Sequence, residues 1–189
     1  MASSVQSSEI VLVLCHSFFH DAFRPHKPLD SNVFKTWTSS RFVANLIIEK
    51  QARLSEGSFF AFTSKQVFDS FASKFEGDKP SAKLIETVQI LHNSIYVVGG
   101  NALKNLSDDD SVFVICDILY SRSNYKPILV SDIPKKVEKA ETFYHKKDAN
   151  AKIPYPICNA IEVELILRDK FPELCNLVDR RLKKSLIEA

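Results

Sequence analysis

The stretch VLVLCHSFFHD brings together residue types that can act as nucleophiles or hold a metal ion. Cys15 with His16 could form a thiolate–imidazole pair or part of a zinc site, and His20 follows His16 at a spacing that metal-binding helices use. Adjacent residues at a strand end point to opposite faces, so Cys15 and His16 cannot easily share one ion. We therefore interpret Cys15 as a buried thiol. A His16–His20 metal site would need a third ligand, and Asp21 and His26 are its nearby candidates.

Three aspartates follow other apolar runs of the chain. Asp69 follows SFFAFT by several residues, Asp110 is the last of three consecutive acids, and Asp132 directly follows KPILVS. Grouped carboxylates repel one another unless a hard divalent cation such as Mg²⁺ or Mn²⁺ lies between them. Such an ion activates water in phosphodiester cleavage. We predict that these three acids form a catalytic metal site. The alternative, solvated acids at helix starts, stays open for each one, and Asp108 and Asp109 are interpreted as N-cap and helix-dipole partners.

Short apolar runs that alternate with helical patterns must position these residues. We predict strands over residues 9–15, 58–63, 95–100 and 126–132, with a short fifth over 153–159. Helical patterns cover residues 39–57, 64–77, 81–94, 106–122 and 133–147, and two further helices broken at Pro172 end the chain, whereas residues 24–32 are predicted to be a loop. Alternation of this kind predicts a three-layer α/β/α sandwich with a small parallel sheet of four or five strands. Ligand sites of such sheets lie at the carboxyl ends of the strands.

The motifs and their order resemble the PIN-domain nucleases over residues 10–166. VLVLCHSFF resembles the opening strand of that family, with Cys15 in place of Asp, His16 in place of Thr, and Ser17 retained. TSKQVFDSF, DDDSVFVICDIL and ILVSDIPKKVEKA resemble the second, third and fourth acidic motifs, and IPYPICNAIEVELIL resembles the final strand and helix. These motifs carry Asp69, Asp110 and Asp132, the last of them one place earlier than usual.

The resemblance implies a Mg²⁺- or Mn²⁺-dependent endoribonuclease. Ser17 and Ser131 would position ligands or phosphate, and Lys135 and Lys136 could hold phosphates, although a solvated helix face explains these lysines equally well. Cys15 occupies the slot of an acid that normally supplies a ligand at the centre of the metal site, and a thiolate suits Mg²⁺ poorly. We therefore expect catalysis to be weakened or lost, with no cofactor if it is lost. The alternative is a non-catalytic RNA-binding or protein-interaction module.

The composition sets limits on the class of protein. With 189 residues, 45% hydrophobic content and a net charge of +2, the chain is expected to form one domain without the basic field of a strong duplex binder. Four cysteines without a CxxC pair favour reduced thiols and a cytoplasmic or nuclear location. Among only four glycines there is no phosphate-binding loop, which disfavours a nucleotide-binding domain.

Three segments and a set of partners follow from these patterns. We expect a disordered N-terminus over residues 1–8, a PIN-like domain over 9–170, and an amphipathic helix over 171–189 that packs on the domain or on a partner. Candidate partners are single-stranded RNA, another protein or a second copy of the chain. No apolar run reaches the length of a membrane span, so no membrane association is expected.

Overall fold

The sheet contains five parallel strands. The computed structural model describes residues 10–24, 27–52, 59–77, 82–122 and 125–187; the predicted disordered segment 1–8 lies outside them. The strands are β1 (Ile10–Leu14), β2 (Phe59–Ser64), β3 (Tyr96–Val98), β4 (Lys126–Val130) and β5 (Ile157–Cys158). The α-helices in the described part are α1 (His16–Ala22), α2 (Ser31–Ala52), α3 (Lys65–Gly77), α4 (Ala82–Ser94), α5 (Asp108–Ser121), α6 (Ile133–His145), α7 (Ala160–Lys170) and α8 (Pro172–Ile187), and a 3₁₀ turn covers Asn101–Leu103.

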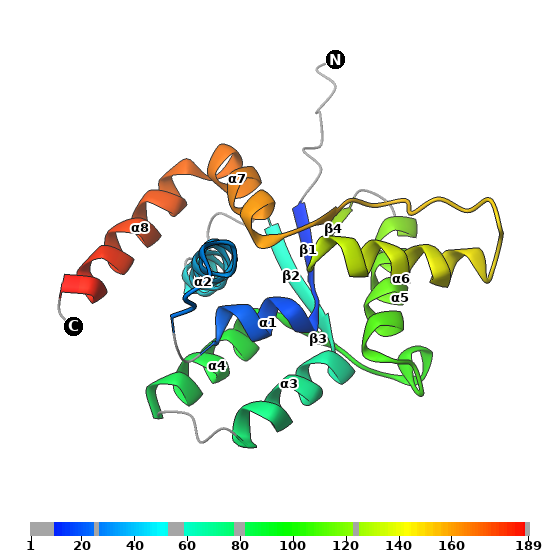
Figure 1. The fold of residues 1–189 in the computed structure, drawn as a ribbon, viewed down its shortest axis with the longest axis horizontal. Coiled ribbons are helices and arrows are strands. Elements are labelled where there is room, and N and C mark those ends of the chain that lie inside the picture. The colour runs from blue at the N-terminus through cyan, green and yellow to red at the C-terminus, as the bar shows by residue number, and fades with distance from the viewer. Residues whose placement is uncertain (1–9, 25–26, 53–58, 78–81, 123–124, 188–189) are drawn as a thin grey trace, which may run out of the picture.

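Helices cover both faces of the sheet, which confirms the predicted three-layer α/β/α sandwich (Figure 1). Helices α1, α2, α4 and α7 lie on one side, and α5 and α6 lie on the other. Because both faces are covered, the strands are continuous apolar runs rather than alternating ones. In β1, the central strand, residues 11–14 are fully buried, and β1 pairs with β2 on one side and β4 on the other.

The strand order β3-β2-β1-β4-β5 contains a reversal of direction. From β1 the chain moves outward through β2 to β3, and it then returns to place β4 on the opposite side of β1. The crossover helices of the two halves lie on opposite faces, and they leave a crevice between the carboxyl ends of β1 and β4. We call this place the switch point. It is where a parallel sheet of this order is expected to bind a ligand.

Helix α2 begins at Ser31, eight residues before the predicted start, so part of the predicted loop 24–32 is helical. Asp30 caps the new start, since its Oδ1 accepts hydrogen bonds from the backbone N–H groups of Asn32 (2.9 Å) and Val33 (3.1 Å). The sequence TWTSS contains residues of weak helix propensity, but the hydroxyls of Thr36 and Thr38 bond back to carbonyls one turn earlier. Local side-chain hydrogen bonds therefore hold the first two turns of α2 despite the weak helix propensity of their residues.

The C-terminal helix α8 packs on α2 and α7 of the same chain. Its Cys175 and Val178 are buried, and Arg168 of α7 donates to Asp179 of α8 at 2.8 Å. Apolar contact and this ion pair together attach α8 to the sandwich. None of the helices in the described part has both the length and the apolar character that a membrane crossing needs.

Candidate functional site

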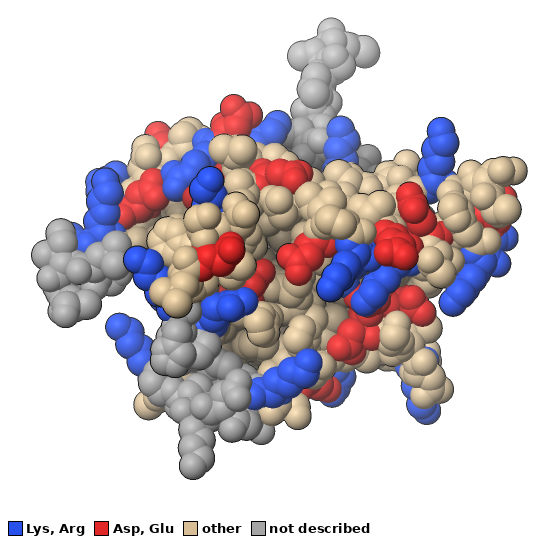
Figure 2. Space-filling model, in the orientation of Figure 1, with Lys and Arg blue, Asp and Glu red and all other residues tan. Residues whose placement is uncertain are grey.

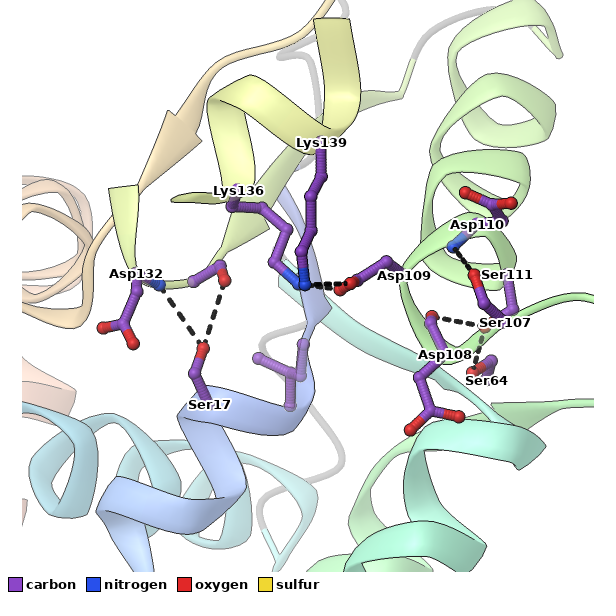
Figure 3. Close-up of polar contacts among 12 residues, drawn as sticks. Ser17, Ser64, Ser107, Asp108, Asp109, Asp110, Ser111, Asp132, Lys136 and Lys139 are labelled. Carbon is purple, nitrogen blue, oxygen red and sulfur yellow. Dashed lines mark hydrogen bonds and ion pairs between the residues drawn. The ribbon is translucent and has the colours of Figure 1, made fainter. Parts of the chain in front are cut away.

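The carboxyl ends of β1 and β4 are joined by a small set of polar contacts at the switch point (Figure 3). The hydroxyls of Ser17 and Ser131 lie 3.1 Å apart, and the backbone N–H of Asp132 donates to Ser17 Oγ at 3.3 Å. The backbone N–H of Cys15 donates to the carbonyl of Val130 at 3.2 Å. These contacts fix the start of α1 against the end of β4. The two serines that were predicted to position ligands thus lie together.

Cys15 has a fully buried side chain with 1% exposure. Burial raises the pKa of its thiol to about 11, against the opposing effects of the nearby Lys136 charge and a hydrogen bond with Ser131. The thiol is therefore protonated at neutral pH and is neither a nucleophile nor a ligand for a hard cation. This agrees with its interpretation as a buried thiol. Burial also lowers the pKa of His16, so this imidazole is neutral near pH 7.

A buried lysine lies next to this group. The side chain of Lys136, on the first turn of α6, is only 10% exposed, and its ammonium donates to Oδ1 of Asp109 at the start of α5. Lys139, one turn later, donates to Oδ2 of the same carboxylate at 2.7 Å. Burial alone would raise the pKa of Asp109, but the hydrogen bonds and charges of Lys136 and Lys139 outweigh it and lower that pKa. We call these three residues the Asp109 cluster.

The three aspartates predicted to hold a metal line separate hollows. Asp69 lines an open hollow of about 410 Å³ beside β3, where it pairs with Lys65 and is 59% exposed. Asp110 lines an open hollow of about 530 Å³ between α5 and α6. Asp132 lines a hollow of about 10 Å³ at the switch point. No group of three His, Cys, Asp or Glu side chains suited to a metal ion occurs in the described part of the chain.

The three acids that open α5 point in different directions in Figure 3. Ser107 is the N-cap residue, because its Oγ accepts the backbone N–H of Asp110 at 3.1 Å, so the prediction of an acidic N-cap was wrong. A short hydroxyl side chain supplies the acceptor and leaves all three carboxylates free to point elsewhere. Asp109, rather than Asp110, faces α6, since successive helix residues are rotated by about 100°. The position of Asp109 in the first turn, near the positive end of the helix dipole, agrees with its predicted role there.

Asp21 and Ser40 also lie at the switch point, and the sequence did not predict a role for Ser40. Both line the switch-point hollow with Asp132. Burial, and secondarily the charge of Asp132, raise the pKa of Asp21. Ser40, at 0% exposure on α2, could not be found from the sequence, because a serine inside a helix carries no signal of what its hydroxyl faces.

Acidic and basic side chains are interspersed on the face drawn in Figure 2, without one large region of a single sign. Asp109 and Lys139 of the Asp109 cluster also line the 530 Å³ hollow, together with Lys135, Lys146, Asp110, Glu138 and Phe143. Neither Lys135 nor Lys146 forms an ion pair with a described residue. These two ammonium groups are therefore available to an external anion.

Fold and site define a parallel α/β/α sandwich with a polar carboxyl edge at its switch point. Comparisons of the chain with models of protein families, with curated proteins and with solved structures found no match.

Proposed function

We propose that the protein is a PIN-like domain of the metal-dependent endoribonuclease class in which catalysis is weakened or lost, and which binds single-stranded RNA at the carboxyl edge of its sheet. The observation that carries this proposal is the buried ammonium of Lys136, paired with Asp109 and next to Cys15. The Lys136 ammonium places a positive charge next to Asp109, whose carboxylate would otherwise attract a metal cation. Mg²⁺ or Mn²⁺ would be the cofactor of any residual activity.

Loss of catalysis follows from two features that act together. Cys15 supplies a protonated thiol where a carboxylate would be needed, and the pKa of about 11 keeps it so at neutral pH. Lys136 and Lys139 neutralise Asp109, so its carboxylate is already satisfied without a metal. A divalent ion bound there would have to displace two ammonium groups and would be repelled by their charges. Asp69 is paired with Lys65, but both side chains are largely exposed, so this pair opposes a metal ion less strongly.

RNA binding is supported by the lysines that the Asp109 cluster leaves available. Lys135 and Lys146 lie in one open hollow together with a partly buried aromatic residue, Phe143. Ammonium groups contact phosphates regardless of sequence. The Phe143 ring packs against Phe113 and lies under the Lys147 ammonium, so a base would have to displace Lys147 to stack on that face. The small net charge of +2 favours a weak single-strand binder over a tight duplex binder.

Restoring a metal site tests the catalytic half of the proposal. We expect the natural chain to cleave a labelled single-stranded RNA barely or not at all with millimolar Mn²⁺. The double variant Cys15→Asp/Lys136→Met should gain Mn²⁺-dependent cleavage, because it adds a carboxylate and removes the ammonium. The matched control Cys15→Asn/Lys136→Met has nearly the same shape without the charge and should stay inactive. Efficient cleavage by the natural chain that disappears in Asp110→Asn would show an intact nuclease and refute the proposal.

Fluorescence polarisation with the same RNA tests the binding half. Charge reversal in Lys135→Glu/Lys146→Glu should weaken binding and reduce the slope of log K against log salt by about 1.4. A control with the same charge change, Lys126→Glu/Lys170→Glu, alters exposed residues at the N-terminal start of β4 and the C-terminal end of α7 and should bind almost normally. Equal weakening by both double variants would mean that the carboxyl edge is not the RNA surface.

A further inference from the structure

The hollow at the switch point has the size of a single small occupant. Its volume of about 10 Å³ is near the smallest that holds one water molecule. Two carboxylates line it, Asp21 from α1 and Asp132 from the start of α6, together with Ser17, Ser40 and Ser131. The lining therefore combines these oxygen-bearing side chains with apolar ones such as Phe18, Val130 and Ala160, and its described residues supply no lysine or arginine charge.

Ser40 has a buried hydroxyl that the described residues leave without a hydrogen-bond partner. The whole residue is completely buried. Buried hydroxyls in folded proteins are almost always satisfied by protein, water or a ligand. The hydroxyls of Ser17 and Ser131, which also line the hollow, share a hydrogen bond with each other and not with Ser40.

The two carboxylates distinguish a cation from a water molecule. Asp132 is the N-cap residue of α6, but its carboxylate makes no capping hydrogen bond. In Figure 3 this carboxylate points away from Lys136. The side chain of Asp21 is only 14% exposed; the Arg24 guanidinium lies 3.6 Å and the His20 imidazole 3.8 Å from its Oδ1, and neither residue lines the hollow. Asp21 is thus partly buried and shares the hollow with the exposed Asp132, and two carboxylates of like charge at one place are unfavourable unless a positive charge joins them.

We propose that the switch-point hollow binds one hard divalent cation, Mg²⁺ or Mn²⁺, through the carboxylates of Asp21 and Asp132, with Ser40 Oγ as a neutral oxygen partner. Carboxylate and hydroxyl oxygens are the donors that these ions prefer. Asp132 is exposed to solvent, so the ion keeps water molecules on its open side, as Mg²⁺ does when one or two carboxylates hold it. This site goes beyond the proposed function, because it needs neither RNA nor Asp69 and Asp110.

Titration of Mn²⁺ into the metal-free 189-residue chain, with free Mn²⁺ measured by electron paramagnetic resonance, tests the site. We expect one saturable site whose dissociation constant rises at least tenfold in Asp21→Asn and in Asp132→Asn. In Asp69→Asn and Asp110→Asn, which alter acids of other hollows, it should stay within twofold. Arg24→Gln should tighten binding, because it removes the guanidinium that competes for Asp21. A tighter site cannot arise from unfolding, so this variant keeps the test decisive if Asp21→Asn does not fold.

Two outcomes would overturn the site. Absence of saturable binding at millimolar Mn²⁺ would mean that the hollow holds only water, and the proposal of weakened catalysis and RNA binding would be untouched. Saturable binding that is lost in Asp69→Asn or Asp110→Asn but kept in Asp21→Asn would place the metal at the acids expected from the nuclease resemblance. In that case the assignment to the switch point fails, and the RNA cleavage experiment decides separately whether catalysis survives.

Discussion

At the carboxyl edge of the sheet, the carboxylate of the Asp109 cluster and those of the switch point differ in whether lysines pair with them. In the Asp109 cluster, each oxygen of one carboxylate accepts a hydrogen bond from a lysine of α6, and the first of these lysines is itself buried. At the switch point, Asp21 and Asp132 line one small hollow whose described lining includes no lysine or arginine. In the Asp109 cluster both carboxylate oxygens are paired with lysines, whereas at the switch point the basic neighbours of Asp21 among the described residues, Arg24 at 3.6 Å and His20 at 3.8 Å from Oδ1, lie outside the hollow.

This difference shows that a carboxylate can either stabilise the fold through an internal ion pair or stay able to bind an external cation. A carboxylate whose charge is matched inside the protein stabilises the fold and has little to gain from an external ion. A carboxylate that is partly buried near another one costs stability until a cation arrives. The pKa shifts follow the same division, because the pKa of Asp109 is lowered and that of Asp21 is raised. Replacing the same chemical group on each side therefore gives opposite effects.

The largest effect is expected for Asp109→Asn. This change leaves the buried ammonium of Lys136 without its carboxylate, and we expect it to reduce the free energy of unfolding at pH 7 by about 2–3 kcal/mol. Urea denaturation of the variant and the natural chain measures the difference. A loss below about 0.5 kcal/mol would show that Lys136 reaches solvent or another acceptor and that the network is not complete.

The same pair of proteins gives a pH test. Because the folded-state pKa of Asp109 is lowered, its contribution is fully present above the unfolded-state value of about 3.9 and is lost as pH falls through the folded value. The stability difference between the natural chain and Asp109→Asn should be constant from pH 5 to 7 and shrink below about pH 4. A difference that instead grows as the pH falls would contradict the assigned sign.

The layers and strands could be predicted from the sequence because they depend on burial on both faces of the sheet. Runs such as VLVL contain only apolar residues, and only a strand covered on two sides tolerates that pattern. The early start of α2 was missed because its first two turns are polar and are held by Asp30 and by hydroxyl groups. That information is local, but it resembles a loop more than a helix.

The site was harder to predict because it depends on rotations of single residues. In DDDS, a shift by one residue decides whether Asp109 or Asp110 faces α6, and composition and spacing cannot resolve a rotation of about 100°. One signal was present in the sequence: Lys136, Lys139 and the buried Ala140 lie three or four residues apart on one helical face. A lysine on a face that also carries an alanine of the core favours an acid opposite it, which would have pointed to the ion pair of Lys136.

A smaller effect is expected for Lys136→Met. The substitution removes the buried ammonium but leaves Asp109 paired with Lys139, and the methionine can fill the apolar part of the site. We expect a loss of about 1 kcal/mol in the free energy of unfolding, less than for Asp109→Asn, because a buried charge costs more when it loses its partner than when it is removed. Urea denaturation of both variants checks this order. Lys139→Met is the control; its exposed ion pair should contribute well under 1 kcal/mol.

The smallest and most informative effect is expected for Asp21→Asn in metal-free buffer. Burial and the nearby Asp132 raise the pKa of Asp21, so its ionised form is disfavoured in the folded state. For an acid with a raised folded-state pKa, the cost is present above that pKa and disappears as the pH falls below the unfolded value. Asparagine has nearly the same shape without the charge, and we expect the variant to be equally stable or up to about 0.5 kcal/mol more stable at pH 7.

Thermal unfolding is measured with a chelator present and again with saturating Mn²⁺. The change in melting temperature caused by Mn²⁺ is then compared between the natural chain and the variants. The natural chain should gain stability with Mn²⁺ and Asp21→Asn should gain clearly less, whereas Asp109→Asn should start from a lower melting temperature and gain as much as the natural chain. If Asp21→Asn were destabilised as strongly as Asp109→Asn in the absence of metal, both carboxylates would be internally compensated. Asp21 would then be stabilised by charges within the protein as Asp109 is, and the switch point would have no reason to bind a cation.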